Sequence, residues 1–497
     1  CRVQGAGCRV QGAGCRVRGA GCVVRGAGGG QGAGERASVS RPCPVRVPSV
    51  SRPCRVRVPS VSRPCPVRSG ILRVTPFFTG NTFFWSFQQG EKFSIMRKAY
   101  FASCVVFCYA LLSTCLYAQS NQQTTVTKFV SDNPTLAIVQ FDGTEAAKKQ
   151  LLNTLYKCDW FRILPDKQAA KAQIRLQVRH RDNPHAYDAQ VTTAAQAPFL
   201  CSGRHDNLNE ASFALVDEIL KKLFNVPAYC TRRIAFVLSG QNHMKEIYSC
   251  FLDGSGQERI TNNAAISTEP DWGHRNAMVY TMARNNSLSV VLVDMLNKRQ
   301  RVISQSWGLN SSASLSPDGQ FVALTLSRER RVDLYVKDLA SNKERRLTND
   351  ICVESSPCWA PDGQTICFVS DKVGKPQLYL LPVQGGKAQR LQTGGNECVS
   401  PDWSIVSNKL CYSTKSNSGQ YVLAVLDMKQ KNPMPQIITA AAGNWEAPSW
   451  APDGRHLVCV RSSGRNRDLY IVDSWLKSIT PISQGANLAL PAWAPAF

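Results

Sequence analysis

The stretch that decides the fold is Pro357–Gly363, PCWAPDG, with the apolar run ICFVS at Ile366–Ser370 directly after it. Proline suits the first position of a tight turn, and glycine tolerates the positive φ that such turns require. An apolar segment on each side of this turn predicts two antiparallel strands joined by a hairpin. The chain continues with QLYLLPV and QRLQ, which predict a third and a fourth short strand.

The same unit recurs along the second half of the chain at intervals of 43 to 47 residues. The P-x-W element stands at Pro270, Pro357, Pro401, Pro448 and Pro491, and a degenerate copy at Ala313–Leu315 is placed in register by Ser316-Pro317-Asp318-Gly319. Four short strands in about 40–45 residues is the size of one β-propeller blade. The tryptophans recur at one position of the first strand, which predicts core side chains.

The two ends of this array complete each other. The segment Arg232–Thr261 holds strands two to four without a preceding strand one, and Leu490–Pro495 is a strand one with no partner after it. Pairing them closes a ring of six blades and removes the exposed sheet edges. The alternative is an open array of β-hairpins, which leaves both ends unpaired.

A smaller region of mixed pattern precedes the array. Strands are predicted at Leu136–Phe141, Phe161–Leu164, Gln173–His180 and Ala186–Thr193, and helices at Thr144–Cys158 and Glu210–Phe224. The expected fold class is therefore mainly β, a six-bladed β-propeller (231–497) preceded by a small α/β domain (135–230). Residues 119–134 are polar and are predicted to be a flexible segment.

Residues 1–95 carry short repeats of seven and eleven residues, CRVQGAG near Cys1 and SVSRPC from Ser38. Neither repeat has an apolar face that could form a core, and known repeat folds use longer units. Our hypothesis is that this low-complexity tract is non-native translation upstream of Met96. The alternative is a basic, disordered arm for nucleic acid or an anionic surface.

Residues 96–118 have the pattern of a secretory signal peptide. Arg97 and Lys98 are followed by an apolar stretch from Ala99 to Leu116 and by the small residue Ala118. A polar segment follows directly, which favours cleavage over the alternative of a membrane anchor. The expected location is the periplasm.

Composition is less informative than it first looks. The chain of 497 residues carries a formal charge of +24 and 20 cysteines, but +15 of that charge and ten of the cysteines lie before Gln119, most of the charge in the tract 1–95. The remaining +9 does not point to nucleic acid as a partner. Pairing among the other ten cysteines stays open in an exported chain, although Cys367, Cys411 and Cys459 have the pattern of small buried hydrophobes.

Three segments resemble the TolB family, the periplasmic β-propellers of the Tol-Pal system in Gram-negative bacteria. They are VDEILKKL at Val216–Leu223, TRRIAFV at Thr231–Val237 and PAWAP at Pro491–Pro495. The resemblance covers roughly residues 130–497. The chain departs from the repeat at Gly273–Asn276 and Ser404–Ser407, where the P-D-G turn is absent, although Asn276 can adopt a left-handed turn.

The resemblance implies a non-enzymatic binding protein without a metal or another cofactor. It implies docking of a Pal-like peptidoglycan-associated lipoprotein on the loops between strand four of one blade and strand one of the next, and a role in outer-membrane integrity and cell division. The expected partner-binding residues are Glu269, Leu309, Asn310, Ser312, Glu354, Ser355, Asn396, Glu397, Asn444 and Glu446. The resemblance also implies a TolA-like partner for the mature N-terminal segment, but Gln119–Val130 is so polar that we locate no such motif. Contact with the outer membrane would come only through partners.

Two alternatives remain from the residues themselves. A propeller domain of a peptidase-like hydrolase would need a G-x-S-x-G motif, which the sequence lacks, as it lacks H-E-x-x-H and a P-loop. Asp253–Gly256 looks briefly like a calcium loop, but the other ligands are missing, so we interpret it as a turn. The second alternative is a propeller that binds glycan or peptidoglycan through its tryptophans.

Overall fold

The computed structural model describes residues 2–4, 7–9, 133–240, 244–483 and 487–496. The predicted signal peptide and nearly all of the segments 1–95 and 119–134 lie outside these ranges. At the start of the chain, β1 (Arg2–Gln4) pairs with β2 (Gly7–Arg9) in a two-stranded antiparallel sheet. Among the described residues no helix is long and apolar enough to span a membrane.

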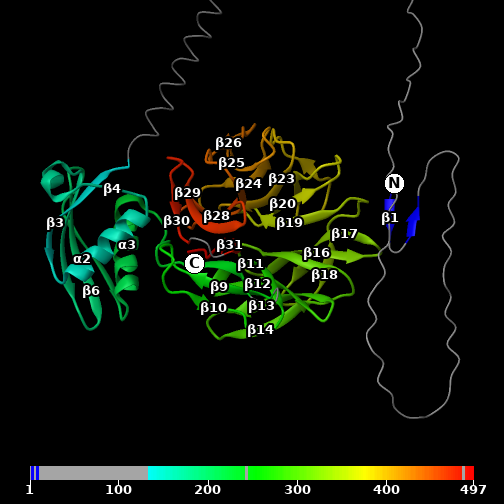
Figure 1. Cartoon of the computed structure of the whole chain (residues 1–497), viewed down its shortest axis with the longest axis horizontal. Coiled ribbons are helices and arrows are strands. Elements are labelled where there is room, and N and C mark those ends of the chain that lie inside the picture. Colours follow the sequence, from blue (N-terminus) through cyan, green and yellow to red (C-terminus); the bar gives the residue numbers. More distant parts are fainter. Residues whose placement is uncertain (1, 5–6, 10–132, 241–243, 484–486, 497) are drawn as a thin grey trace, which may run out of the picture. The chain divides into compact units, whose positions relative to one another are not determined.

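The first large element is a five-stranded sheet with helices against it, called here the α/β region (Figure 1). Its elements are β3 (Thr135–Asp142), α2 (Glu145–Lys157), β4 (Arg162–Ile163), the 3-10 helix η1 (Asp166–Lys171), β5 (Ile174–Arg181), β6 (His185–Thr193), β7 (Phe199–His205) and α3 (Leu208–Phe224). The strand order is β4-β3-β5-β6-β7, with β3 parallel to both β4 and β5 and the other pairs antiparallel.

Local chemistry explains where the two helices begin and end. The Thr144 side chain accepts a hydrogen bond from the Ala147 amide at 3.3 Å and caps α2. Asn207 caps α3 in the same way, and Asn225 ends it in the left-handed conformation with φ 54°. The first amides of a helix have no partner inside the helix, and the side chains of Thr or Asn just before it accept hydrogen bonds from them. A residue in the left-handed conformation is a common end of a helix. Both predicted helices are confirmed.

The strands of the α/β region follow their predicted alternation. In β5 every second residue is buried, namely Ile174, Leu176, Val178 and His180. The strand β7 was not predicted. It contains Gly203, where an added Cβ would lie 2.3 Å from the Leu215 amide nitrogen of α3. Helix α3 therefore packs directly on this glycine.

The rest of the chain forms four-stranded antiparallel units. They are β11–β14 (Ile266–Trp272, Ala277–Arg284, Ser287–Asp294, Arg299–Ser304), β15–β18 (Asn310–Leu315, Phe321–Arg328, Arg331–Asp338, Glu344–Arg346), β19–β22 (Glu354–Trp359, Thr365–Ser370, Gln377–Pro382, Gln389–Arg390), β23–β26 (Cys398–Trp403, Lys409–Lys415, Tyr421–Asp427, Gln436–Ile437) and β27–β30 (Asn444–Trp450, His456–Ser463, Asn466–Asp473, Ile479–Pro481). Each begins with the predicted P-x-W strand or its degenerate copy. The short 3-10 helix η3 (His274–Asn276) replaces the missing turn, and Asn276 takes the predicted left-handed conformation.

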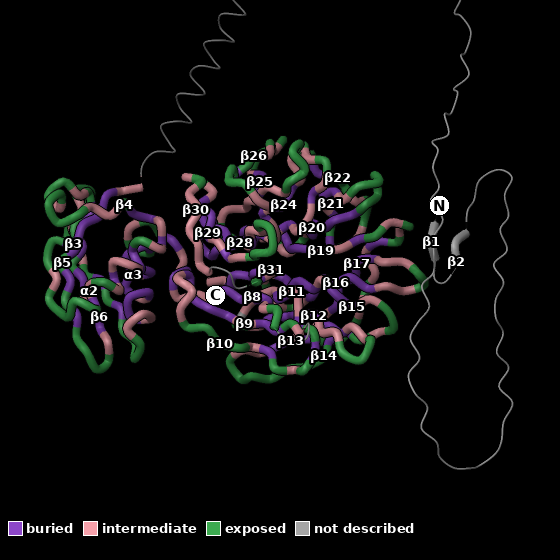
Figure 2. The backbone as a smooth tube through the Cα atoms, viewed as in Figure 1, coloured by how far each residue is buried: buried purple, intermediate pink, exposed green. Residues whose placement is uncertain are grey.

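The last strand of the chain pairs with the first strand that follows the α/β region. β31 (Leu488–Trp493) pairs antiparallel with β8 (Ile234–Ser239), which continues into β9 (Lys245–Cys250) and β10 (Glu258–Arg259). A single parallel pair, Ile266 with Lys245, joins this group to β11, so the two groups form one eight-stranded sheet. The predicted pairing of the C-terminal strand is present. Buried residues follow the central strands, and exposed ones follow the connections (Figure 2).

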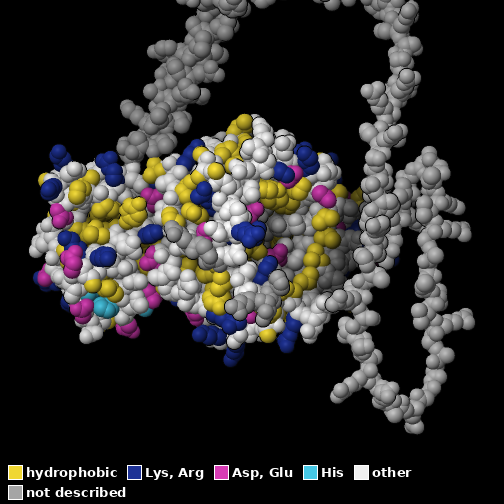
Figure 3. Space-filling view, viewed as in Figure 1, with side chains coloured by type: hydrophobic (Ala, Val, Ile, Leu, Met, Phe, Trp, Pro, Cys, Tyr) yellow, Lys and Arg dark blue, Asp and Glu magenta, His cyan; other side chains and the backbone are white. Residues whose placement is uncertain are grey.

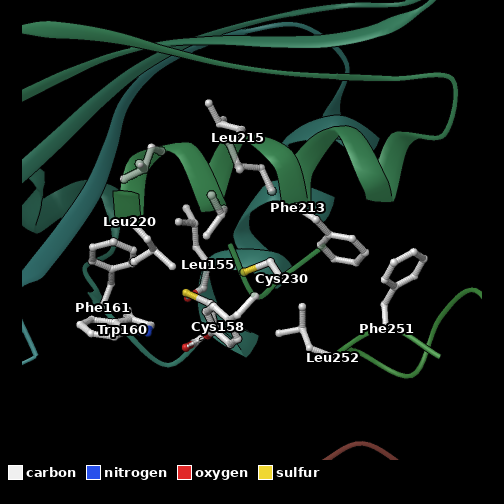
Figure 4. Packing of buried hydrophobic residues seen from close by; sticks show 14 of the residues in the cluster. Leu155, Cys158, Trp160, Phe161, Phe213, Leu215, Leu220, Cys230, Phe251 and Leu252 are labelled. Atoms are coloured by element: carbon white, nitrogen blue, oxygen red, sulfur yellow. Dashed lines mark hydrogen bonds between the residues drawn. The ribbon is translucent and has the colours of Figure 1, made fainter. Parts of the chain in front are cut away.

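One hydrophobic cluster runs from the α/β region into the strands that follow it. Figure 4 shows Phe213 of α3 facing Phe251, whose ring centroid lies 5.1 Å away, with Leu252 beside them. The connection is tied by the buried Asp217 of α3, whose carboxylate accepts hydrogen bonds from the amides of Tyr229, Cys230 and Thr231. These contacts hold the end of α3 beside the start of β8.

Candidate functional site

The first strands of the sheets surround one central cavity. A space of about 160 Å³ is lined by residues of β11, β15, β19, β23, β27 and β31. Each of these strands carries a β-bulge with one extra residue at the same place. Sheets arranged around a common channel in this way form a β-propeller.

Each bulge contains a non-glycine residue in the left-handed region. The six residues have φ between 48° and 54° and are Glu269, Ser312, Ser356, Ser400, Ala447 and Leu490. A non-glycine residue in this conformation costs about 1–3 kcal/mol, and bulges of this kind are used to redirect side chains beside binding sites. The end of the channel that these residues surround is called here the mouth.

Two half-buried carboxylates, Asp271 and Asp402, lie deeper in the channel and line its wall. The Asp271 carboxylate accepts a hydrogen bond from the Leu315 amide at 2.9 Å, and Asp402 accepts one from the Trp450 amide at 2.6 Å. Burial raises the pKa of Asp271 to about 7 and that of Asp402 to about 6. Each carboxylate thus bonds to the first strand of the next unit and stabilises the channel wall.

The ten predicted partner-binding residues all lie in or just before first strands, at the mouth end. The prediction that they occupy loops was wrong for the seven that lie inside strands, namely Glu269, Asn310, Ser312, Glu354, Ser355, Asn444 and Glu446. The remaining three, Leu309, Asn396 and Glu397, lie in the connections. The bulge explains the difference. Each first strand begins before its bulge, and the residues there are polar, so their sequence resembles that of a loop.

Asn310 is fully buried, so it does not present its side chain to a partner. Its amide oxygen accepts hydrogen bonds from the Ser304 hydroxyl and the Ser306 amide, and its amide nitrogen donates to the Ser306 and Gly308 carbonyls. It therefore shapes the connection β14–β15. That connection exposes Trp307, whose side chain is 99% accessible.

The next connection, β18–β19, has the same organisation. Ile351 is 94% exposed, whereas Glu354 is buried and one of its oxygens has no hydrogen-bond partner. Burial raises the pKa of Glu354 to about 7. The backbone of Val353 is held by the Asp371 carboxylate at 2.8 Å. Trp307 and Ile351 are thus presented on adjacent, internally bonded connections at the mouth.

Sequence reasoning missed Trp307 and Ile351. The available signal was a large apolar residue in a polar connection, in SQSWGLN and in TNDICVE, which no strand pattern uses. A contiguous exposed apolar patch can mark an interaction site, whereas a single exposed apolar side chain is common.

Other predicted residues hold neighbouring strands together. The Glu269 carboxylate accepts hydrogen bonds from the Ser312 amide and the Thr281 hydroxyl, both at 2.8 Å. The Glu397 carboxylate accepts one from the Tyr421 hydroxyl at 2.9 Å, and this bond together with Lys415 lowers its pKa.

Asn444 and Glu446 also bond to neighbouring strands. Asn444 accepts a hydrogen bond from the Tyr421 amide at 3.0 Å, and Glu446 accepts one from the Ser462 hydroxyl. Of the ten, Asn396 is exposed, and the residues of intermediate exposure are Glu269, Leu309, Ser312, Ser355, Glu397, Asn444 and Glu446.

In the described residues, two groups of side chains are close enough together to bind a metal ion. In the group Asp159, His456 and Asp473, the guanidinium of Arg455 already bonds to Asp473 at 3.1 Å, so a cation is present there as a side chain. The other group is His180, Asp182 and His185, at the far end of the α/β region.

Within residues 133–496 the cysteines form no disulfide. The ten cysteines of residues 133–496 are unpaired, and every one except Cys352 is buried. The interpretation of Cys367, Cys411 and Cys459 as small core residues is confirmed, and the tryptophans of P-x-W strands are likewise mostly buried, as predicted.

A family model described as the TolB beta propeller domain matches residues 220–497. The chain belongs to the TolB β-propeller family. Among curated relatives, the Tol-Pal system protein TolB of Desulfosudis oleivorans is 33% identical over 106 residues, which cover 21% of this chain. The match spans only 24% of that relative's own length.

The fold comparison agrees with the family. The crystal structure of TolB from Acinetobacter baumannii superposes with a TM-score of 0.65 over 73% of this chain and 97% of that chain, at 22% identity. The propeller of this TolB-family chain and the mouth at its first strands are therefore the part of the molecule in which to seek function.

Proposed function

We propose that this TolB-family chain is a non-enzymatic component of a Tol-Pal envelope system, which binds a Pal-like peptidoglycan-associated lipoprotein at the propeller mouth. It would act in the periplasm and contribute to outer-membrane integrity and cell division. The observation that carries the proposal is the pair of exposed apolar side chains, Trp307 and Ile351, on hydrogen-bonded connections at this mouth.

The chemistry of the mouth suits a protein partner. Large exposed apolar side chains surrounded by polar groups are typical anchor residues of protein interfaces. The surrounding polar residues Asn396, Ser312 and Ser355 remain accessible and can complete hydrogen bonds at the rim. The buried members Asn310 and Glu354 act through the shape of the connections and do not contact the partner.

We further propose that the propeller comprises six blades at 231–497 and that residues 135–230 form a separate α/β domain. Six equivalent left-handed bulges around one cavity support the first statement. In this arrangement the eight-stranded sheet consists of two blades, one of them closed by β31. The periplasmic location and a TolA-like partner also remain part of the proposal.

The test is a binding titration with the purified protein and a soluble Pal-like domain from the same organism. The variants Trp307→Ala and Ile351→Ala should each weaken binding by more than about tenfold, since truncating an aromatic or apolar hot spot costs about 2 kcal/mol or more. Their melting temperatures should stay unchanged, because both side chains are in solvent.

The matched control is Leu296→Ala. Leu296 is 72% exposed and lies in the turn between β13 and β14, at the opposite end of the strands that carry Trp307. It should bind like the parent. Equal binding by all three variants would overturn the assignment of the mouth, and binding of peptidoglycan fragments without any lipoprotein binding would overturn the function.

A further inference from the structure

The tip of the β5–β6 hairpin brings together three side chains of the kinds that bind metal ions. His180 ends the buried face of β5, Asp182 lies in the turn, and His185 begins β6. The Asp182 Oδ1 lies 3.8 Å from the His180 Nδ1 and 3.2 Å from the His185 Nδ1. Figure 3 shows histidine side chains beside acidic ones at this end of the α/β region.

The two imidazoles lack the hydrogen bonds that buried polar rings normally make. Both ring nitrogens of His180 and the Nδ1 of His185 are buried and make no hydrogen bond within the described part of the chain. His180 is 7% exposed, and its ring lies between those of Tyr187, at 4.6 Å, and His185, at 5.4 Å. Buried polar atoms without partners cost free energy and require an explanation.

The strand position makes the histidine more unusual. It follows Ile174, Leu176 and Val178 on the same buried face, where an aliphatic side chain would continue the core at no such cost. In the described residues, neither ring nitrogen of His180 has a hydrogen-bond partner, so both remain available to a ligand.

We propose that His180, Asp182 and His185 bind one divalent transition-metal ion, of which Zn²⁺ is the best match. Bonds of about 2.0–2.2 Å in a tetrahedral site separate neighbouring ligand atoms by about 3.4 Å, and the distances of 3.2 and 3.8 Å bracket this value. Two imidazole nitrogens select Zn²⁺ and similar ions over Ca²⁺ or Mg²⁺, which prefer oxygen ligands.

The site is open to solution on one side. The side chain of Asp182 is 54% exposed and that of His185 is 28% exposed, so an ion can enter without unfolding the sheet. Three protein ligands leave a fourth tetrahedral position for water or for a group of another molecule. This inference does not depend on the function proposed for the propeller.

The test is a Zn²⁺ titration of the purified, tag-free full chain, followed by calorimetry, after accessible thiols have been blocked with iodoacetamide. We expect one ion per chain at this site. The variants Asp182→Ala and His185→Ala should weaken binding by more than about a hundredfold, because even loss of a residue that only supports a ligand costs about 10–100-fold.

The matched control is His205→Ala. His205 lies directly opposite His185 on β7, but its Nδ1 accepts a hydrogen bond from the Asn207 amide and its Nε2 lies 3.4 Å from Glu210. This variant should bind Zn²⁺ within about twofold of the parent. Thermal unfolding without metal checks that all variants are folded.

Three results would overturn the proposal: no binding by the parent, parental affinity in both ligand variants, or loss of binding in His205→Ala alone. A titration with Co²⁺ adds an independent readout. Its visible absorption should be present in the parent and absent from His185→Ala.

Discussion

Arg455 provides the sharpest test of how the α/β region is held to the propeller. Its side chain is 3% exposed, and its Nε donates to the Asp473 carboxylate at 3.1 Å. The guanidinium also donates to the Asn133 side chain at 2.7 Å and lies over the rings of Trp160 and Trp475, at 4.6 and 4.8 Å. Residues on both sides of the junction thus share one cation.

We expect Arg455→Met to lower the free energy of unfolding by about 3 kcal/mol. Loss of one partner of a buried ion pair costs about 3–5 kcal/mol, because the other charge stays buried without compensation. The lower end applies because Asp473 also accepts hydrogen bonds from the amides of Trp475, at 2.7 Å, and Leu476, at 3.2 Å. Methionine preserves most of the contact with the two indole rings.

The assay is urea unfolding followed by tryptophan fluorescence. If the cost comes from the stranded carboxylate, the double variant Arg455→Met with Asp473→Asn should be more stable than Arg455→Met alone. The control is Arg461→Met, whose guanidinium also lies over two rings, at 5.4 and 5.7 Å, but has no carboxylate partner among the described residues. It should lose about 1 kcal/mol or less.

Two outcomes would refute this reasoning. One is a loss below about 1 kcal/mol for Arg455→Met, which would mean that the buried pair is replaced at little cost. The other is a double variant that loses the sum of the two single effects, since additive losses indicate no coupling between the two side chains.

Three further predictions concern single sites. Because burial raises the pKa of Glu354 to about 7, the folded protein keeps this proton above the pKa of the unfolded chain, and stability should fall as pH rises from about 4.5 to about 7. Urea unfolding should therefore show that the free energy of unfolding of Glu354→Gln, relative to the parent, is higher at pH 8 than at pH 5. A difference between the two proteins that is the same at both pH values would contradict this. Among the cysteines of residues 133–496, Cys352 should be alkylated first in the native protein, and mass mapping that finds another of them modified before unfolding would be contrary. Gly203→Ala should destabilise by about 2 kcal/mol or more in thermal or urea unfolding, because its Cβ would meet the Leu215 backbone nitrogen at 2.3 Å. Gly240→Ala, with 3.7 Å to the nearest atom, should change little, and equal losses for both would count against the packing argument.

The repeated hairpins were predictable because turn chemistry and apolar alternation agree in the repeats that keep the P-D-G turn. Pro361-Asp362-Gly363 marks the turn, and the segments beside it carry the period of strands. The two helices were predictable for the same reason, since their caps and their apolar faces coincide. The strand β7 was not, because Gly203 weakens its local pattern and its presence depends on close packing against α3.

The position of the ten named residues at one end of the channel was predictable, but their surroundings were not. The sequence located the connections at one end of the channel, yet the bulges at Glu269, Ser312 and their counterparts are set by tertiary packing around the channel. Whether a polar residue such as Asn310 or Glu354 faces outward or inward depends on a backbone turn that composition does not reveal. Trp307 becomes a candidate binding residue only because its side chain is exposed, which the sequence alone does not show.

The pairing of β31 with β8 also sets an order in time. A ribosome releases Ile234–Ser239 long before Leu488–Trp493, and at about 5–20 residues per second the interval is roughly 12–50 s. During that interval β8 presents an unpaired edge to any other strand. Completion of the last sheet must therefore follow synthesis, and a message truncated shortly before Leu488 would yield a chain whose open edge invites aggregation.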